Sequence, residues 1–168
     1  MEKRVEFYEK NLDRVNYWLQ FAETKNAAAI AFIVAMLAVV YTSNLIDNLV
    51  LVILITAVYV VSLIIAILSL YPQYKKDVKS SDGTYKNTDN LLFWNDIAKY
   101  SVDDYIDKVT KNFFKNNNAI ISALELSFVE EIITNARIAK FKYNMFRTSV
   151  GFSILGTVLI PIFLIIIA

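Results

Sequence analysis

The chain has no cysteine and no histidine among its 168 residues. Without cysteine there are no disulfides, thiol nucleophiles or thiolate metal ligands, and without histidine the commonest general base and metal ligand are missing. Glycine is also scarce, and Gly83, Gly151 and Gly156 do not form a glycine-rich phosphate loop. The paired acids Asp103 and Asp104 are better explained as a helix start than as catalytic carboxylates. We therefore expect no enzyme, no catalytic residue, no metal site and no cofactor.

The net charge is close to zero. A formal charge of +1 at pH 7 gives no basic surplus of the kind that binds nucleic acid, so no nucleic-acid partner is expected. Charge is instead absent from three long apolar runs, Ala27–Tyr41, Leu49–Tyr71 and Val150–Ala168. A chain this short could hardly enclose three such helices in a soluble core. The runs therefore favour a membrane protein that contacts lipid.

The apolar runs are long enough to cross a bilayer. At about 1.5 Å per helical residue, the second run spans the ~30 Å hydrocarbon core, and the third does so despite Pro161. The first run reaches the far interface if Thr42–Ile46 extends it. Because no charged residue lies within the runs, a monomer offers no proton relay or gating charge. A conducting path would need an oligomer or a disordered bilayer.

Lysine and arginine flank these runs unequally. The hairpin Thr42–Asn48 carries none, whereas the two other flanking segments carry all of them. The positive-inside rule therefore places the N-terminus and residues 72–148 in the cytoplasm, with the C-terminus at the outer face. The segment Met1–Asn26 is charged throughout, so we do not expect it to be a signal peptide.

The polar segments are also predicted to be helical. We expect an all-α membrane protein in four parts. These are a cytoplasmic amphipathic helix over 1–26, a transmembrane helical hairpin over 27–71, a cytoplasmic helical segment over 72–148 and a third transmembrane helix over 149–168. Neither the first nor the third span is separated from its cytoplasmic neighbour by a helix breaker. Two of the three spans should therefore extend into a cytoplasmic helical stalk.

The N-terminal segment carries a heptad seam. Its apolar residues alternate at spacings of three and four, namely Val5, Tyr8, Leu12, Val15, Leu19 and Ala22. This pattern favours packing against a partner helix. The alternative is a helix that lies flat on the lipid surface with Phe7, Trp18 and Phe21 dipping in. The acidic residues of the segment argue against adhesion to anionic lipid.

The middle segment contains a helix start and a long apolar stripe. Ser101 is the expected N-cap of a helix that runs to Lys115, and Asn116–Asn118 should form a turn. From Ala119 onward a second helix is expected to continue into the third span. Its stripe consists of Ile120, Leu124, Phe128, Ile132, Ala136, Ala139, Tyr143, Phe146 and Val150.

Each span also carries a seam of small residues. The seams are Ala28, Ala31, Ala35 and Ala38 in the first span, Ser62, Ala66 and Ser69 in the second, and Ser149, Ser153 and Gly156 in the third. In lipid, close packing and interhelical hydrogen bonds drive association, so such seams mark helix–helix contacts. Packing within one monomer and self-association between monomers both fit the pattern. We expect a homo-oligomer.

Four charged residues should share one depth at the membrane entrance. Glu23 and Lys25 precede the first span, and Lys142 and Arg147 precede the third. If both helices cross the membrane, Glu23 can pair with Lys142 or with Arg147. In that partly dehydrated layer such a pair can fix helix register, which is useful in a switch. Interfacial anchoring by snorkelling side chains is the alternative.

A short apolar patch, Leu91–Trp94, interrupts the polar middle segment. It fits a plug that packs against the helical stalk or lies at the membrane surface. A second interpretation makes the rings of Phe93 and Trp94 a stacking platform for a nucleotide base. The cations that would then reach the phosphate are Lys99, Arg137 and Lys140.

Several short motifs, in order along the chain, resemble one family. Ala22–Lys25 resembles an Ala-Asp-x-Lys-Ala motif, with Glu23 in place of the aspartate and Asn26 in place of the last alanine. The other matches are Leu70–Tyr71–Pro72 at the end of the hairpin, Phe93–Ile97 with Ser101–Tyr105 as an Ile-Ala-x-x-Ser-x-x-x-Tyr stretch, and Lys142–Tyr143 before the last span. Together they are similar to the transmembrane effectors of Pycsar, the bacterial pyrimidine-cyclase anti-phage system.

The resemblance implies an anti-phage defence effector of the bacterial inner membrane. Such an effector is switched on by a cyclic pyrimidine nucleotide, cCMP or cUMP, and then impairs the membrane so that the infected cell stops growing. The chain has no cyclic-nucleotide-binding β-roll, so a ligand site would lie within Tyr74–Arg147 or between subunits. The alternative function is a non-enzymatic membrane adaptor that recruits a soluble partner through its cytoplasmic helices.

Overall fold

The fold is all-α, as the sequence predicts. A computed structural model describes residues 2–42, 49–73, 85–86, 88–114 and 120–167, and these residues form helices and loops with no strand. The helices are α1 (Glu2–Thr42), α2 (Leu49–Leu70), α3 (Trp94–Ile97), α4 (Val102–Val109), the π-helical turn η3 (Thr110–Phe114) and α5 (Ala123–Ile167). Three of them, α1, α2 and α5, are long and apolar enough to cross a membrane.

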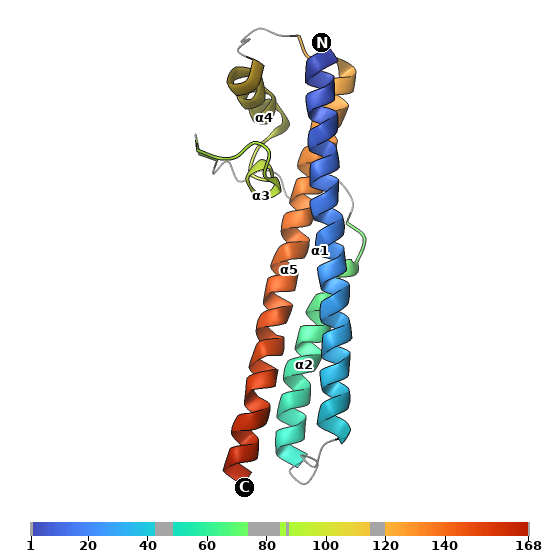
Figure 1. The fold of residues 1–168 in the computed structure, drawn as a ribbon, viewed down its shortest axis with the longest axis vertical. Coiled ribbons are helices and arrows are strands. Elements are labelled where there is room, and N and C mark those ends of the chain that lie inside the picture. Colours follow the sequence, from blue (N-terminus) through green and yellow to red (C-terminus); the bar gives the residue numbers. More distant parts are fainter. Residues whose placement is uncertain (1, 43–48, 74–84, 87, 115–119, 168) are drawn as a thin grey trace. The chain divides into compact units, whose positions relative to one another are not determined.

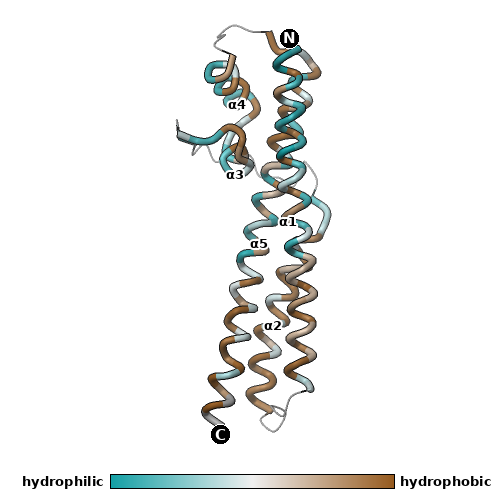
Figure 2. Tube along the Cα trace, in the orientation of Figure 1, coloured by the Kyte–Doolittle hydropathy of each residue, from teal (hydrophilic) through white to brown (hydrophobic). Residues whose placement is uncertain are grey.

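The chain divides into two compact units. Unit 1 consists of Met1–Phe21 and Pro72–Phe141, and unit 2 consists of Ala22–Tyr71 and Lys142–Ala168. Helices α1 and α5 each contribute residues to both units, which is why each is about twice as long as a bilayer requires. All three apolar runs fall in unit 2, and Figure 2 shows its helices coloured hydrophobic over most of their length.

Unit 1 is built around one buried cluster. Figure 1 shows α3 and α4 beside the first part of α1 and the first part of α5. From α1 the cluster takes Tyr8 and Val15, both fully buried, so the heptad seam faces the interior of the chain. The remaining buried members are Leu91, Ile97, Ala98, Tyr100, Tyr105, Ile106, Val109, Val129, Ile132, Ile133 and Ala136.

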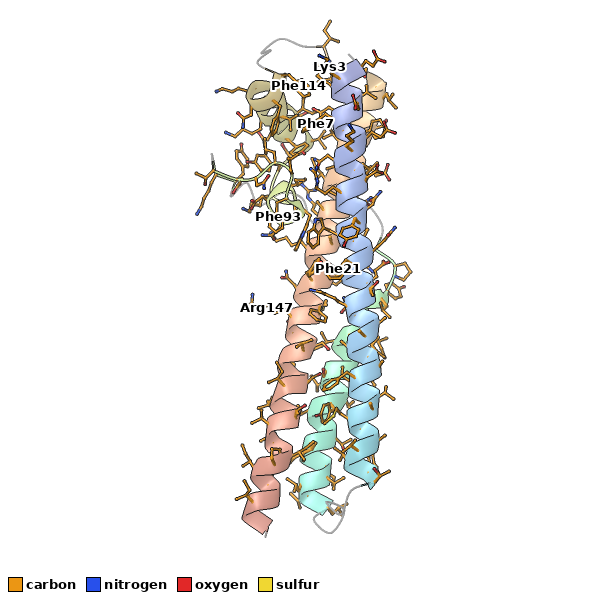
Figure 3. The ribbon with its side chains drawn as sticks, in the orientation of Figure 1. Lys3, Phe7, Phe21, Phe93, Phe114 and Arg147 are labelled. Atoms are coloured by element: carbon orange, nitrogen blue, oxygen red, sulfur yellow. The ribbon has the colours of Figure 1, made fainter. Side chains whose placement is uncertain are left out.

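Three aromatic residues of α1 test the alternative in which this helix lies flat on the lipid surface. The ring of Phe7 lies 5.2 Å from that of Phe113 and 5.6 Å from that of Phe114, centroid to centroid (Figure 3). Phe7 therefore packs on protein. Trp18 and Phe21 instead contact each other, and Phe21 stays 38% exposed.

The starts of α4 and α5 are set by side-chain caps. Ser101 accepts the backbone N–H of Asp104 at 3.1 Å, which confirms it as the N-cap of α4. The predicted start of the second helix at Ala119 lies outside the described residues, and Ile120 precedes α5 with 87% of its surface exposed. The predicted stripe is therefore wrong at Ile120, and at Leu124, which is 55% exposed.

A capping box explains where α5 begins. The backbone N–H of Glu125 donates to Ser122 Oγ at 3.2 Å, and Glu125 Oε2 accepts the Ser122 backbone N–H at 2.8 Å. This reciprocal arrangement satisfies donors that the first turn leaves unpaired. The same carboxylate forms a 2.8 Å ion pair with Arg4 of α1, and the Glu125 side chain is fully buried. The pattern Ser-x-x-Glu was the available sequence signal for this start.

Unit 2 is a bundle of α2 with the second part of α1 and the second part of α5 (Figure 1). The serine seams of the last two spans pack together within it. Ser62 donates to the carbonyl of Ser149 at 2.7 Å and lies 2.8 Å from Ser153 Oγ. In hydrocarbon such hydroxyls find no water, so their bonds to one another hold α2 against α5.

The small-residue seam of the first span does not pack within the monomer. Ala28, Ala31, Ala35 and Ala38 are all exposed. The buried face of this part of α1 consists of Ala22, Asn26, Ala29, Ile33 and Val40. Packing within one monomer is therefore the wrong interpretation for this seam. It is correct for the seams of the second and third spans.

Substitution of Gly156 tests the contact between α2 and α5. A Cβ at this position would lie 3.0 Å from the ring of Tyr59, whose hydroxyl is 2.8 Å from Thr157 Oγ1. Gly156→Leu should therefore displace that ring and destabilise unit 2 by about 1–3 kcal/mol, measured by thermal denaturation in detergent micelles. Gly151→Leu is the matched control, because nothing lies within 4 Å of its Cβ. Equal destabilisation by both would contradict the packing described.

Candidate functional site

The central residue of the predicted charged layer is Lys142 on α5. Its side chain is 5% exposed, and its ammonium lies 3.0 Å from Glu23 Oε1 on α1. The same ammonium donates to the backbone carbonyl of Ser69 on α2 at 3.0 Å. One buried cation therefore joins all three helices of unit 2. Of the two partners considered for Glu23, the structure shows Lys142.

The hydrogen bond from Lys142 to the Ser69 carbonyl also stabilises the C-terminal end of α2. The last carbonyls of a helix have no partner within the helix, and the helix dipole places negative charge there. Pro72 follows closely and cannot continue the helix. A buried lysine ammonium is well suited to this position because it donates to the orphan carbonyl and opposes the dipole.

Asn26 is a further member of the layer that sequence reasoning missed. It is fully buried, and its Nδ2 donates to the backbone carbonyl of Lys142 at 3.2 Å and to that of Ala22 at 2.9 Å. A buried amide costs free energy unless it is hydrogen-bonded, so these bonds fix the register of α1 against α5. The signal was present in the sequence, since Asn26 follows Ala22 by four residues and so continues the buried seam.

The other two charged residues of the layer lie elsewhere. The Lys25 ammonium is 5.4 Å from the ring centroid of Tyr143 and 5.5 Å from that of Phe146. This is cation–π geometry, in which the ring quadrupole attracts the cation. Arg147 is exposed and points from α5 away from α1 and α2 (Figure 3). The layer therefore consists of a buried lysine paired with a half-exposed glutamate, a second lysine held over two aromatic rings, and an outward arginine.

The apolar patch of the middle segment lies against unit 1. Leu91 is buried in the cluster and Trp94 packs partly against it, whereas Phe93 is 38% exposed. The patch thus contacts the residues of α1 and α5 that form the core of this unit.

The cations near the patch make contacts within the chain. Lys99 pairs with Asp96 at 2.5 Å and with Asp89 at 3.0 Å, and the hydrogen bond to Asp96 raises the pKa of the lysine. Arg137 donates to the carbonyls of Ala98 and Tyr100, the latter at 2.7 Å. The two bonds from Arg137 hold the segment after α3 against α5.

The remaining cation of the patch, Lys140, is half-buried on α5. Two hollows of unit 1 carry the opposite charge. One of about 510 Å³ is lined by Asp103 and Asp107, and one of about 580 Å³ by Glu2, Glu6 and Glu9. Carboxylates repel an anionic ligand, so neither hollow suits a phosphate group. Among the residues with a defined position, no cluster of acidic side chains is placed to hold a metal ion.

Two buried tyrosines predict how unit 1 responds to alkali. Burial raises the pKa of Tyr105, and burial together with Asp89 raises the pKa of Tyr100 to about 12. Unfolded tyrosines ionise near pH ~10, so the unfolded state loses protons first and stability falls as the pH rises from about 10 to about 12. Below pH ~10 this contribution is fully present. Tryptophan fluorescence measures the transition, because both tryptophans, Trp18 and Trp94, belong to unit 1.

Tyr100→Phe is the matched variant for that measurement. It removes one of the tyrosines of unit 1 whose pKa is raised, so the loss of stability over the same pH interval should become smaller. An unchanged pH profile would show that Tyr100 does not contribute to it.

Comparison with known proteins adds one match. A family model described as the Pycsar effector protein domain matches residues 7–168, which includes most of both units. No curated protein and no solved structure matches the chain.

Proposed function

This chain belongs to the Pycsar effector family, and we propose that it impairs the bacterial inner membrane when a cyclic nucleotide signal switches it on. Membership supports an anti-phage effector role and a membrane location, in line with the three helices that are long enough to span a bilayer. Membrane damage and growth arrest of the infected cell go beyond family membership and are what we propose.

The proposed topology has the N-terminus and residues 72–148 in the cytoplasm and the C-terminus at the outer face. It is supported by the distribution of lysine and arginine, which are absent from the hairpin at Thr42–Asn48 and frequent in the other flanking segments. With this topology, unit 1 faces the side on which a nucleotide signal is made.

The proposed switch is the buried contact of Lys142 with Glu23 and Ser69. A pair that is partly desolvated contributes little net stability but strongly disfavours a state in which one charge stays behind unpaired. Two arrangements of α1, α2 and α5 that differ in this contact would therefore be separated by a barrier. That is the observation that supports rearrangement of the spans as the working step.

The proposed active form is a homo-oligomer. The spans of one chain hold no charged residue between the two interfaces, so a path for ions needs several copies or a disturbed bilayer. The exposed alanine seam of α1, Ala28 to Ala38, leaves small side chains where another helix can approach closely. The acidic hollows of unit 1 favour a nucleotide site between copies over one inside unit 1.

A membrane adaptor is less well supported. That function needs the heptad seam of α1 to be available to a soluble partner, yet Tyr8, Val15 and Ala22 are fully buried within the chain. Replacing Leu12 and Leu19 with Asp should therefore disturb the protein itself, whereas an adaptor would lose a partner and keep its assembly.

The deciding experiment measures membrane potential in cells that express the full chain together with a pyrimidine nucleotide cyclase. We expect depolarisation to accompany growth arrest, and neither effect with a cyclase lacking activity. Titration of the purified protein with cCMP and cUMP then shows which nucleotide binds, with cAMP as the control. Growth arrest at intact membrane potential would overturn membrane impairment, and saturable binding of neither pyrimidine nucleotide would overturn direct sensing.

A further inference from the structure

Unit 2 has an apolar groove with a cation beside it. The groove has a volume of about 380 Å³ and lies between α1 and α5. Its apolar lining includes Ala28, Phe32, Val150 and Ile154, and Lys25 also contributes to it. None of the residues that line it is acidic.

Small side chains create this groove. Ala28 and Ala29 of α1 stand opposite Ser153 of α5, and none of the three reaches far from its helix. Phe32 and Ile154 flank them and are 48% and 59% exposed. In a membrane this depression faces hydrocarbon, so its occupant must be apolar along most of its length.

The position of Lys25 indicates which chemical group the occupant carries at the end that lies near the membrane surface. Its ammonium is held 5.4 and 5.5 Å from the centroids of the Tyr143 and Phe146 rings, and Phe146 itself lines the groove. Lysine next to a span extends its stem along apolar surface and keeps its charge at the headgroup level. A ligand that suits both features has an acyl chain and an anionic phosphate.

We propose that this groove binds one anionic phospholipid, with an acyl chain along Ala28, Phe32 and Ile154 and the phosphate at Lys25. The groove supplies shape and apolar surface, and the lysine supplies charge complementarity. A zwitterionic lipid carries the same phosphate with a cation next to it, so it should bind less tightly. The proposal needs only that unit 2 lies in a bilayer, and it assigns the Ala28 end of the exposed alanine seam to lipid and not to a second copy.

Native mass spectrometry of the full-length protein tests the proposal with phosphatidylglycerol and phosphatidylcholine of identical chains. We expect one phosphatidylglycerol to be retained in preference to phosphatidylcholine. Lys25→Gln should weaken phosphatidylglycerol binding about fivefold, as expected for one interfacial basic residue, and Lys25→Arg should restore it. Ala28→Leu should weaken binding of both lipids by filling the groove.

Arg147→Gln is the matched control, because Arg147 is the residue next to Phe146 and yet does not line the groove. It should leave phosphatidylglycerol binding within about twofold, since it removes a charge outside the site. Circular dichroism establishes that each variant remains helical, and Ala28→Leu provides the test if Lys25→Gln does not fold.

Three results would overturn the proposal. If Lys25→Gln and Arg147→Gln weaken phosphatidylglycerol binding equally, the lipid binds as part of a general annulus and not at a specific site. Full competition by glycerol phosphate would show a phosphate site without a chain. If Ala28→Leu weakens self-association of the purified protein and leaves phosphatidylglycerol binding unchanged, a second copy and not a lipid fills the groove.

Discussion

Glu125→Ala is expected to destabilise unit 1 by about 3–5 kcal/mol, the range typical of breaking a buried ion pair by removing one partner. The Glu125 side chain is fully buried and pairs with Arg4, whose side chain is 11% exposed. Without the carboxylate the guanidinium stays in this largely dry position and keeps only its 2.8 Å bond to the carbonyl of Ile120. The first turn of α5 also loses its capping box with Ser122.

Chemical denaturation of the full chain in micelles, followed by tryptophan fluorescence, measures this change, because Trp18 and Trp94 both report on unit 1. Glu131→Ala is the control. Glu131 lies on the same helix but is exposed, so its replacement should change the free energy of unfolding by less than about 0.5 kcal/mol. A loss of under ~1 kcal/mol in Glu125→Ala would show that water takes over the role of the carboxylate.

Glu23→Gln is expected to destabilise unit 2 more than Lys142→Met, the variant that removes the buried charge neutralised by Glu23. The variant leaves the Lys142 ammonium, 5% exposed, without its counter-charge. Because the Glu23 side chain is half exposed, we expect about 1–3 kcal/mol, below the full cost of a buried pair. Lys142→Met removes the charge and keeps the volume but takes the donor from the Ser69 carbonyl, so it should be the milder change, with a cost of about 1 kcal/mol. Thermal denaturation in micelles measures each variant.

The double variant separates this explanation from a general loss of packing. Glu23→Gln with Lys142→Met should be no less stable than Lys142→Met alone, because no charge is then left unpaired. Glu9→Gln, an exposed change on α1, is the control and should be silent. In cells, the proposed switch predicts that Glu23→Gln shifts the nucleotide level at which growth stops. Simple addition of the two single effects would contradict coupling between the residues.

The sequence was sufficient for the fold class and for the position of the charged layer. A run without charge over Leu49–Tyr71 has few alternatives to a membrane helix, so composition alone predicts a helix long and apolar enough to span a bilayer. Glu23 and Lys142 were predicted to meet because residues that flank neighbouring spans share a depth. The choice of Lys142 over Arg147 depends on which face of α5 turns inward, and the pattern at that point is too uniform to decide this.

Other features depend on side chains that a hydrophobic pattern does not weigh. The stripe through Ile120 and Leu124 has helical spacing, yet the cap formed by Ser122 and Glu125 starts α5 at Ala123 and leaves Ile120 outside the helix. The alanine pattern of the first span fitted both an internal contact and self-association, and these alanines are exposed because Asn26 turns the other face of α1 toward α5. In both cases one polar residue outweighs several apolar ones, since an unsatisfied buried polar group costs more than a buried methyl group gains.

The bond between Lys142 and the carbonyl of Ser69 also bears on bilayer thickness. Helix α2 has 22 residues, or about 33 Å at 1.5 Å per residue, close to the ~30 Å of hydrocarbon in an average membrane. Because Lys142 joins the end of α2 to α1 and α5, the three helices cannot adjust to a thinner or thicker bilayer by sliding past one another. They must tilt together or strain that bond, so hydrophobic mismatch acts on the same contact that a nucleotide signal is proposed to release.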